Sequence, residues 1–189
     1  MKFVCPPEVA RVLKEIPIWT NFIYLLGAMY SYVHDMKIYA LMFLVISIVS
    51  TIHHVYSERY LKNKTMRRIF YYTDVVICIS LFVFFIALIT FRRPPKQVKS
   101  IFTGKFGKMI KRFLNYKHLI PEYIVKNITT PEVFMILVLS GVGFYLFYKD
   151  LQYEKDEHGL YDIYHGFWHI LTGFTMLLCV VILTEKEIV

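Results

Sequence analysis

Long apolar runs constrain this chain more than any other feature of its sequence. Three of them are nearly uninterrupted over about 20 residues, the helical length needed to cross a bilayer core of about 30 Å. The composition agrees, because 57% of the 189 residues are hydrophobic and the mean hydropathy is +0.48. The sequence therefore predicts an all-α, polytopic transmembrane helical bundle and excludes an ordinary soluble domain.

The apolar stretches and the polar breaks between them predict five spans in a single membrane domain. Only a few polar residues separate the first two spans, which favours a tight antiparallel hairpin. Pro94 and Pro95 cannot continue a helix and close the third span, while Pro131 suits the first turn of the fourth. The expected spans are approximately residues 18–33, 38–56, 69–91, 131–148 and 161–184.

Residues 96–130 contain no long apolar run and are expected to form a different kind of segment. Seven apolar residues recur there at helical spacing among four cations, which are Lys105, Lys108, Lys111 and Arg112. This pattern predicts a basic amphipathic helix lying on the membrane surface. The alternative is an ordered loop packed against the bundle.

Charge and cysteine content narrow the expected partners. The formal net charge is +8, and in a membrane chain juxtamembrane Lys and Arg meet anionic headgroups. Membrane lipids, and not nucleic acid, are therefore the expected partners. The basic residues are nearly balanced between the two membrane faces, so orientation stays open. The three cysteines form no spaced pair, which argues against a disulfide framework or a zinc knuckle.

Polar residues interrupt the spans at three places that the topology brings to one membrane face. They lie at the end of the second span, at the start of the third and near the start of the fifth. An Asp inside a membrane costs about 2.5–3.5 kcal/mol on insertion scales, so it is expected to face inward to a partner. The residues concerned are Ser50, His53, His54, Asp74, His165 and His169.

The spacing of these residues predicts a zinc site. His165 and His169 are four residues apart, so their imidazoles share one helical face about 6 Å apart and can bind one metal. Ser50 and His54 have the same spacing on the facing helix. Three neutral imidazoles with an open fourth position are the ligands of a catalytic zinc, which lowers the pKa of bound water to about 7. Asp74 is suited to accept that water's proton.

Alternatives remain open at several of these positions. His53 is one residue and about 100° around the helix from His54, and is its main rival as a ligand. A salt bridge with Arg67 or Arg68 is the alternative role for Asp74. A bis-histidine haem site would leave the serine and the aspartate unexplained. The remaining histidines are expected to be ordinary interfacial residues: His34, His118 and His158.

The combined pattern resembles the signature of a known group of proteins. Ser50 with His54, then Asp74, then His165 with His169 resemble the Ser, Asp and three-histidine motifs of the CREST superfamily of membrane hydrolases. That superfamily includes alkaline ceramidases, progestin/adipoQ receptors and myomaker-like proteins, and its motifs occupy the second, third and last spans. The doubled histidine at the end of the second span is most similar to the myomaker branch.

The resemblance implies a fold, a metal and two possible functions. His54, His165 and His169 would be zinc ligands, with Ser50 and Asp74 beside the bound water. The implied activity is zinc-dependent hydrolysis of amide or ester bonds in membrane lipids such as ceramides, with the serine donating a hydrogen bond to the developing oxyanion. The alternative is a non-enzymatic, myomaker-like remodelling or fusion protein with a structural zinc. Members of the superfamily have seven spans, whereas five are expected in this chain.

Overall fold

The computed structural model describes residues 15–57, 62–91, 108, 130–153 and 160–187, and these residues form helices and no strand. The all-α expectation is confirmed. Among these described residues, four helices are long and apolar enough to cross a membrane. They are α4 (Lys37–Thr51) with its π-helical continuation η1 (Ile52–Ser57), α6 (Lys64–Phe91), α9 (Pro131–Tyr153) and α10 (Leu160–Glu187).

The first expected span is divided into two shorter helices, α2 (Ile16–Thr20) and α3 (Phe22–Val33). At the division, the backbone N–H of Asn21 donates to the carbonyl of Ile18, and the N–H of Tyr24 donates to the carbonyl of Asn21. Each bond reaches back three residues, which tightens the turn as in a 3₁₀ helix. Asn21 keeps helical dihedral angles, so α2 and α3 together form one rod about 27 Å long.

Two other helices extend five residues beyond an expected limit. α6 begins at Lys64, five residues before the expected start, because the side-chain oxygen of Asn63 accepts the N–H of Thr65 at 2.9 Å and caps the first turn. α9 continues five residues past the expected end at position 148. The expected surface helix at 96–130 lies outside the described residues except for Lys108 and Thr130.

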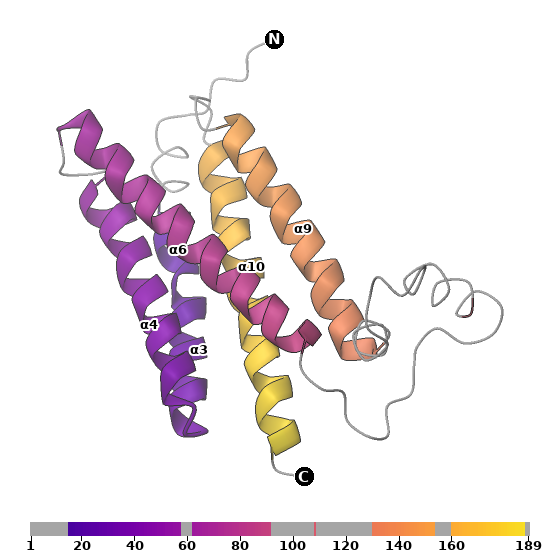
Figure 1. Cartoon of the computed structure of the whole chain (residues 1–189). Helices are drawn as coiled ribbons and strands as arrows, with labels where there is room; N and C mark the ends of the chain where they lie inside the picture. Colours follow the sequence, from indigo (N-terminus) through magenta and orange to yellow (C-terminus); the bar gives the residue numbers. More distant parts are fainter. Residues whose placement is uncertain (1–14, 58–61, 92–107, 109–129, 154–159, 188–189) are drawn as a thin grey trace.

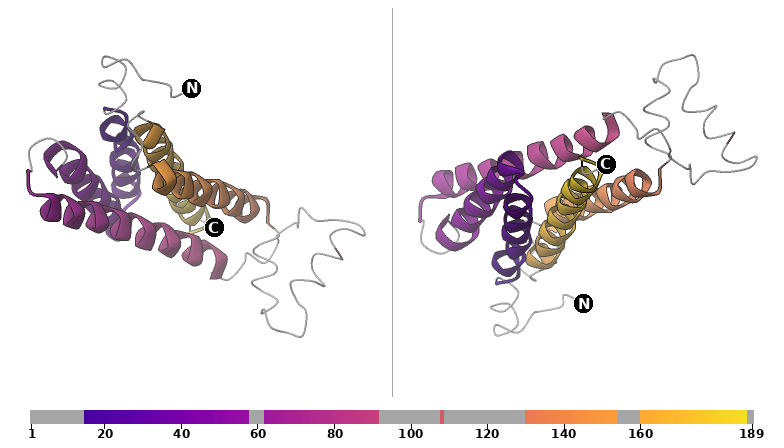
Figure 2. Two further views of the ribbon diagram at one scale, coloured as in Figure 1. Left: turned by 90° about the horizontal axis from the view of Figure 1, so that it is seen from above. Right: turned by 90° about the horizontal axis from the view of Figure 1, so that it is seen from below.

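Successive long helices reverse direction, so α3, α6 and α10 run one way and α4 and α9 run the other (Figure 1). The end-on views in Figure 2 show the α3–α4 pair beside the α9–α10 pair, with α6 lying across one side of both. α10 contacts α2, α3, α6 and α9. This central position allows side chains on α10 to meet residues from every neighbouring element.

Two glycines let α10 approach the first rod closely. A methyl group added at Gly166 would overlap the side chain of Ile16, and one added at Gly173 would overlap Ile23. The two glycines are seven residues apart and therefore lie on the same face, two turns apart. The close approach brings the ring of Tyr24 on α3 against α10, next to the histidines of that helix.

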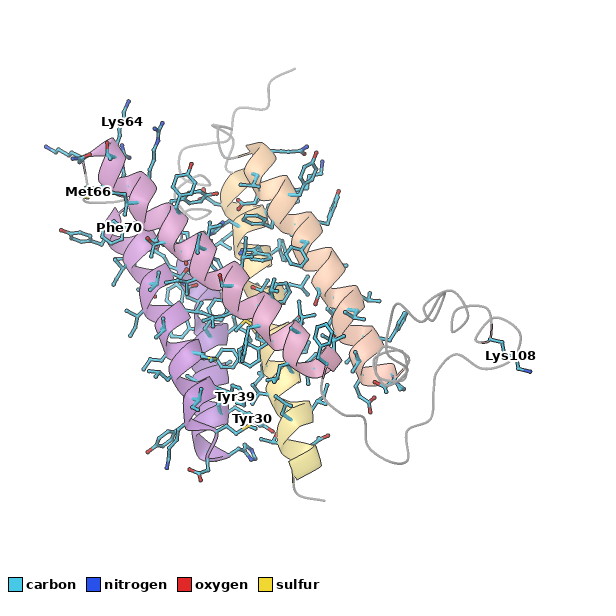
Figure 3. All side chains as sticks on the ribbon, in the orientation of Figure 1. Tyr30, Tyr39, Lys64, Met66, Phe70 and Lys108 are labelled. Carbon is cyan, nitrogen blue, oxygen red and sulfur yellow. The ribbon has the colours of Figure 1, made fainter. Side chains whose placement is uncertain are left out.

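The bundle is apolar on its outside and contains polar side chains inside, the reverse of a soluble protein. Large hydrophobic side chains are exposed along every long helix, for example Leu41, Val76, Val138 and Ile170. The aromatic core includes Phe43, Phe82, Phe85 and Trp168, each at most 1% exposed. Figure 3 shows side chains extending outward around the whole bundle. An outer surface of this kind suits contact with lipid chains.

Candidate metal centre

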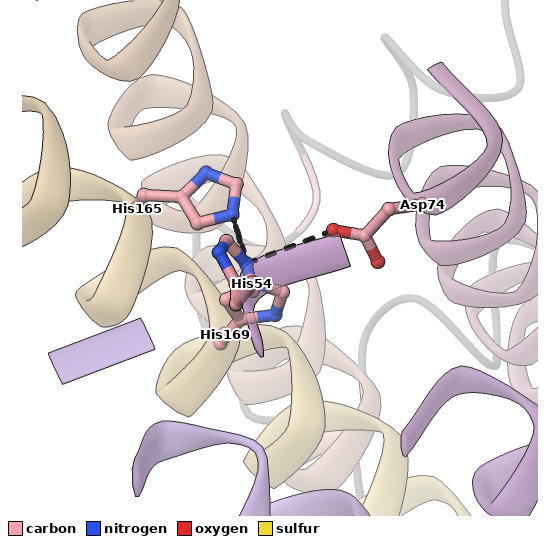
Figure 4. A group of neighbouring side chains, drawn as sticks. All are labelled: His54, Asp74, His165 and His169. Atoms are coloured by element: carbon pink, nitrogen blue, oxygen red, sulfur yellow. Dashed lines mark hydrogen bonds and ion pairs between the residues drawn. The ribbon is translucent and has the colours of Figure 1, made fainter. Parts of the chain in front are cut away.

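Three histidine rings meet inside the bundle near the end at which α10 begins (Figure 4). The Nε2 atoms of His165 and His169 are 2.9 Å apart. Nε2 of His54 lies 3.1 Å from that of His165 and 3.4 Å from that of His169. The sequence separation between His54 and this pair exceeds one hundred residues, so the contact arises only when α4, η1 and α10 are assembled.

The three nitrogens have the spacing that one tetrahedral zinc requires. Two ligands of such an ion, with bonds of about 2.0–2.1 Å, lie about 3.3 Å from each other. The three observed separations of 2.9–3.4 Å bracket this value. All three rings are at most 2% exposed, and imidazole nitrogen is a preferred ligand of zinc and other transition metals. The residues present therefore fit a metal ion.

Asp74 on α6 faces the histidines and completes a group of four buried side chains that could hold one ion. Its Oδ2 atom is 3.8 Å from Nε2 of His54, and one carboxylate oxygen lies within 4.8 Å of the ligand nitrogen of each histidine. Ser50 donates its hydroxyl proton to Asp74 Oδ2 at 3.4 Å and lies 3.5 Å from Nε2 of His169. Cys78 donates its thiol proton to the other carboxylate oxygen at 3.5 Å. The carboxylate is thus held beside the cluster and directed toward it.

His54, and not His53, belongs to the cluster. The His53 ring packs against the rings of His54 and Tyr71, with centroids 4.6 Å and 5.6 Å away, and it is not in the group of side chains able to share one ion among the described residues. Both histidines lie in the π-helical turn η1. Such single turns often occur at functional sites, because the extra residue changes the direction of the side chains that follow.

Asp150, near the end of α9, was not anticipated as part of the site. Its Oδ2 atom accepts a hydrogen bond from Nδ1 of His165 at 3.0 Å, and both side chains are at most 1% exposed. The expected fourth span ended near residue 148, which left Asp150 in the connection to the fifth span, whereas the helix runs on to Tyr153. Because this segment is helical, Asp150 lies inside the bundle.

Tyr24 on α3 is the second unanticipated residue. Its hydroxyl lies 3.2 Å from Nδ1 of His169 and 2.9 Å from the hydroxyl of Thr172. A tyrosine within an apolar run carries no sequence signal that separates it from an ordinary core residue. The five expected site residues and these two come from α3, α4, η1, α6, α9 and α10.

No family model, curated protein or solved structure matches the chain.

Proposed function

We propose that this chain is a multi-pass integral membrane protein whose three-histidine zinc centre hydrolyses amide or ester bonds of membrane lipids. The observation that carries the proposal is the position of Asp74, whose Oδ2 atom lies 3.8 Å from Nε2 of His54 beside the three imidazoles. In this proposal the carboxylate acts beside the metal and is not a fourth ligand. A fourth protein ligand at zinc-bond distance would complete a structural site, whereas a catalytic site keeps that position open. Zinc bound there would supply a Lewis acid for the carbonyl and make a water nucleophilic at neutral pH.

The chain's own side chains have matching roles in this proposal. Asp74 Oδ2 would accept the proton of the attacking water and return it to the leaving group, as a general acid–base pair does. The hydroxyl of Ser50 already points at that carboxylate at 3.4 Å. By turning toward the substrate, it would donate a hydrogen bond to the negative charge that develops on the carbonyl oxygen. Buried surroundings strengthen both interactions, because little water competes for them.

The second candidate function is a non-enzymatic membrane remodelling or fusion protein with a structural zinc. The burial of the site favours this candidate, since Ser50, His54, Asp74, His165 and His169 are at most 2% exposed. A hydrolase needs a path by which a lipid carbonyl reaches the centre. The two candidates share the metal and differ in turnover, so a hydrolysis assay separates them.

The test compares two neighbouring histidines, His54→Ala and His53→Ala, in protein purified in detergent. Zinc content is measured by elemental analysis, and hydrolysis is measured on an N-acyl sphingoid amide and on a glycerolipid ester. We expect His54→Ala to lose most of the zinc and all detectable hydrolysis. His53→Ala is the matched control, because it removes a buried ring of the same type from the same turn and should keep its zinc.

Each outcome decides between the candidates. Zinc in the wild-type protein with hydrolysis of either lipid supports the hydrolase. Zinc without hydrolysis of either lipid contradicts the hydrolase and supports the structural centre. Equal zinc in both variants, or a wild-type protein without a bound transition metal, contradicts the metal centre itself.

The proposal includes a five-span arrangement with the segment 96–130 lying along the interface on the side opposite the histidine end. Each buried Lys or Arg would cost about 2.5–3.5 kcal/mol in a crossing segment. Cysteine labelling tests this arrangement. Gly104→Cys and Gly107→Cys should react from the same side as Lys37→Cys. Protection of both, or reaction from the side of Lys62→Cys, would contradict the five-span arrangement.

A further inference from the structure

We propose that Asp150 and Tyr24 are positioning residues of the metal centre, which fix the tautomers of His165 and His169 so that both Nε2 lone pairs face the same point. The inference rests on the proposed zinc centre and adds two residues that bind no metal themselves. It follows from counting the protons in two buried hydrogen-bond chains, one from α9 and one from α3.

The first hydrogen-bond chain fixes the tautomer of His165. A carboxylate can only accept hydrogen bonds, so the 3.0 Å contact between Asp150 Oδ2 and His165 requires the proton to be on Nδ1 of the ring. A neutral imidazole carries one proton. Nε2 of His165 is then unprotonated and presents its lone pair to the cluster. This is the arrangement in which a carboxylate orients a metal-binding histidine.

The second hydrogen-bond chain fixes the tautomer of His169. The hydroxyl of Thr172 donates its one proton to the backbone carbonyl of Trp168 at 2.7 Å. The 2.9 Å contact between Tyr24 and Thr172 therefore uses the tyrosine's proton. The tyrosine oxygen is left as an acceptor, and the 3.2 Å contact with His169 takes the proton of Nδ1. Nε2 of His169 is then also unprotonated.

The consequence is a pair of unprotonated Nε2 atoms 2.9 Å apart, which repel each other unless a cation lies between them. Two arrangements would close this contact without a metal: His165 could carry its proton on Nε2 and donate it to His169, or His169 could carry its proton on Nε2 and donate it to His165. Asp150 disfavours the first arrangement, because its carboxylate would face an unprotonated Nδ1 of His165. Tyr24 disfavours the second, because its oxygen would face an unprotonated Nδ1 of His169. Removing either residue should therefore weaken metal binding without removing a ligand.

The experiment measures zinc affinity by competition with a chelator for wild-type protein, Asp150→Asn and Tyr24→Phe in detergent. We expect a loss of about 10–100-fold for Asp150→Asn, the range typical of partners that orient metal ligands, and a smaller loss for Tyr24→Phe. Cobalt(II) replaces zinc as a second probe. Its visible absorption reports ligand geometry and should shift in both variants, which a purely structural role would not require.

Tyr30→Phe is the matched control for Tyr24→Phe. Tyr30 lies on the same helix, and its hydroxyl also contacts a threonine of α10, Thr184, at 3.2 Å. Thr184 is fifteen residues beyond His169, so this hydroxyl is remote from the cluster. Tyr30→Phe should bind zinc as wild type does.

The outcomes separate the inference from the proposed function. Wild-type binding that both variants retain within about twofold overturns the inference and leaves the zinc centre standing. Equal losses in Tyr24→Phe and Tyr30→Phe overturn the tautomer role of Tyr24, because they would show a general loosening of the helix pair. A wild-type protein that binds neither zinc nor cobalt overturns the proposed function. If Asp150→Asn does not fold, the comparison of the two tyrosines still decides.

Discussion

The α3–α10 helix pair makes the same side-chain contact at two places, and only one of them adjoins the histidine cluster. Tyr24 bonds to Thr172 at 2.9 Å, and Tyr30 bonds to Thr184 at 3.2 Å. In both places the threonine hydroxyl also donates to a backbone carbonyl four residues earlier. The histidine that lies next to each tyrosine differs between the two places. Near Tyr24 it is the buried ring of His169, which belongs to the candidate metal centre. Near Tyr30 it is His34, which is exposed at the bundle end where Figure 3 labels Tyr30.

This comparison shows that residue type and local contact do not define the site. A tyrosine, a threonine and a histidine occur together at both places, with a hydrogen bond between the tyrosine and the threonine in each. At the histidine end, however, side chains from α4, α6 and α9 also converge on the same point, whereas His34 faces outward. Convergence of side chains from distant segments therefore distinguishes the two ends of the bundle.

The largest expected difference concerns two residues of α6, Asp74 in its first half and Thr90 near its C-terminal end. Asp74→Asn should lower lipid hydrolysis by about 10²–10⁴-fold, the contribution typical of a positioned acid–base group, while zinc content stays near that of the wild type. Thr90→Val removes a hydroxyl that donates to the carbonyl of Ile86 and should leave the rate unchanged. The measurement is the hydrolysis rate with zinc analysis of the same samples. Loss of zinc from Asp74→Asn would instead make the carboxylate a ligand.

An intermediate effect is expected when zinc is removed with a chelator. A ligand present at about 100 times its Kd stabilises the native state by about 2.7 kcal/mol, which corresponds to roughly 5–10 °C in Tm for a chain of this size. Hydrogen exchange should rise around His54 and His165 more than around Tyr30. An equal rise in hydrogen exchange at both ends of the bundle would show that the metal stabilises the bundle as one unit. It would contradict the proposed difference between the two ends.

The smallest effect concerns the close packing beside the cluster. Gly166→Ala should destabilise the protein by about 1–3 kcal/mol, because the added methyl group overlaps Ile16. Gly141→Ala on α9 has no atom within 4 Å of the added group and should stabilise its helix by up to about 1 kcal/mol. Thermal unfolding of the two variants measures the difference in sign. Stabilisation by Gly166→Ala would mean that α10 and α2 pack less closely than the structure shows.

Sequence periodicity predicted the helical class and brought the candidate ligands to one end, because helices of alternating direction place His54, Asp74 and His165 at the same level. It did not distinguish His53 from His54, since the π-helical turn η1 changes side-chain direction without a sequence signal. It also placed Asp150 in a loop, because acidic residues beyond the apolar run indicated solvent, although the helix continues past them. Contacts between helices determine which of these side chains face the cluster. The sequence pattern of a single helix carries no information about those contacts.

The separation of the ligands along the chain has a consequence for biosynthesis. His54 leaves the ribosome more than one hundred residues before His165, so a nascent chain contains one of the three cluster histidines long before α10 exists. A chain truncated before residue 160 would contain one of the three histidines and could not hold an ion in this geometry. Incorporation of an ion would then require insertion of α10, and pulse-labelled chains should become chelator-sensitive only after α10 has entered the membrane.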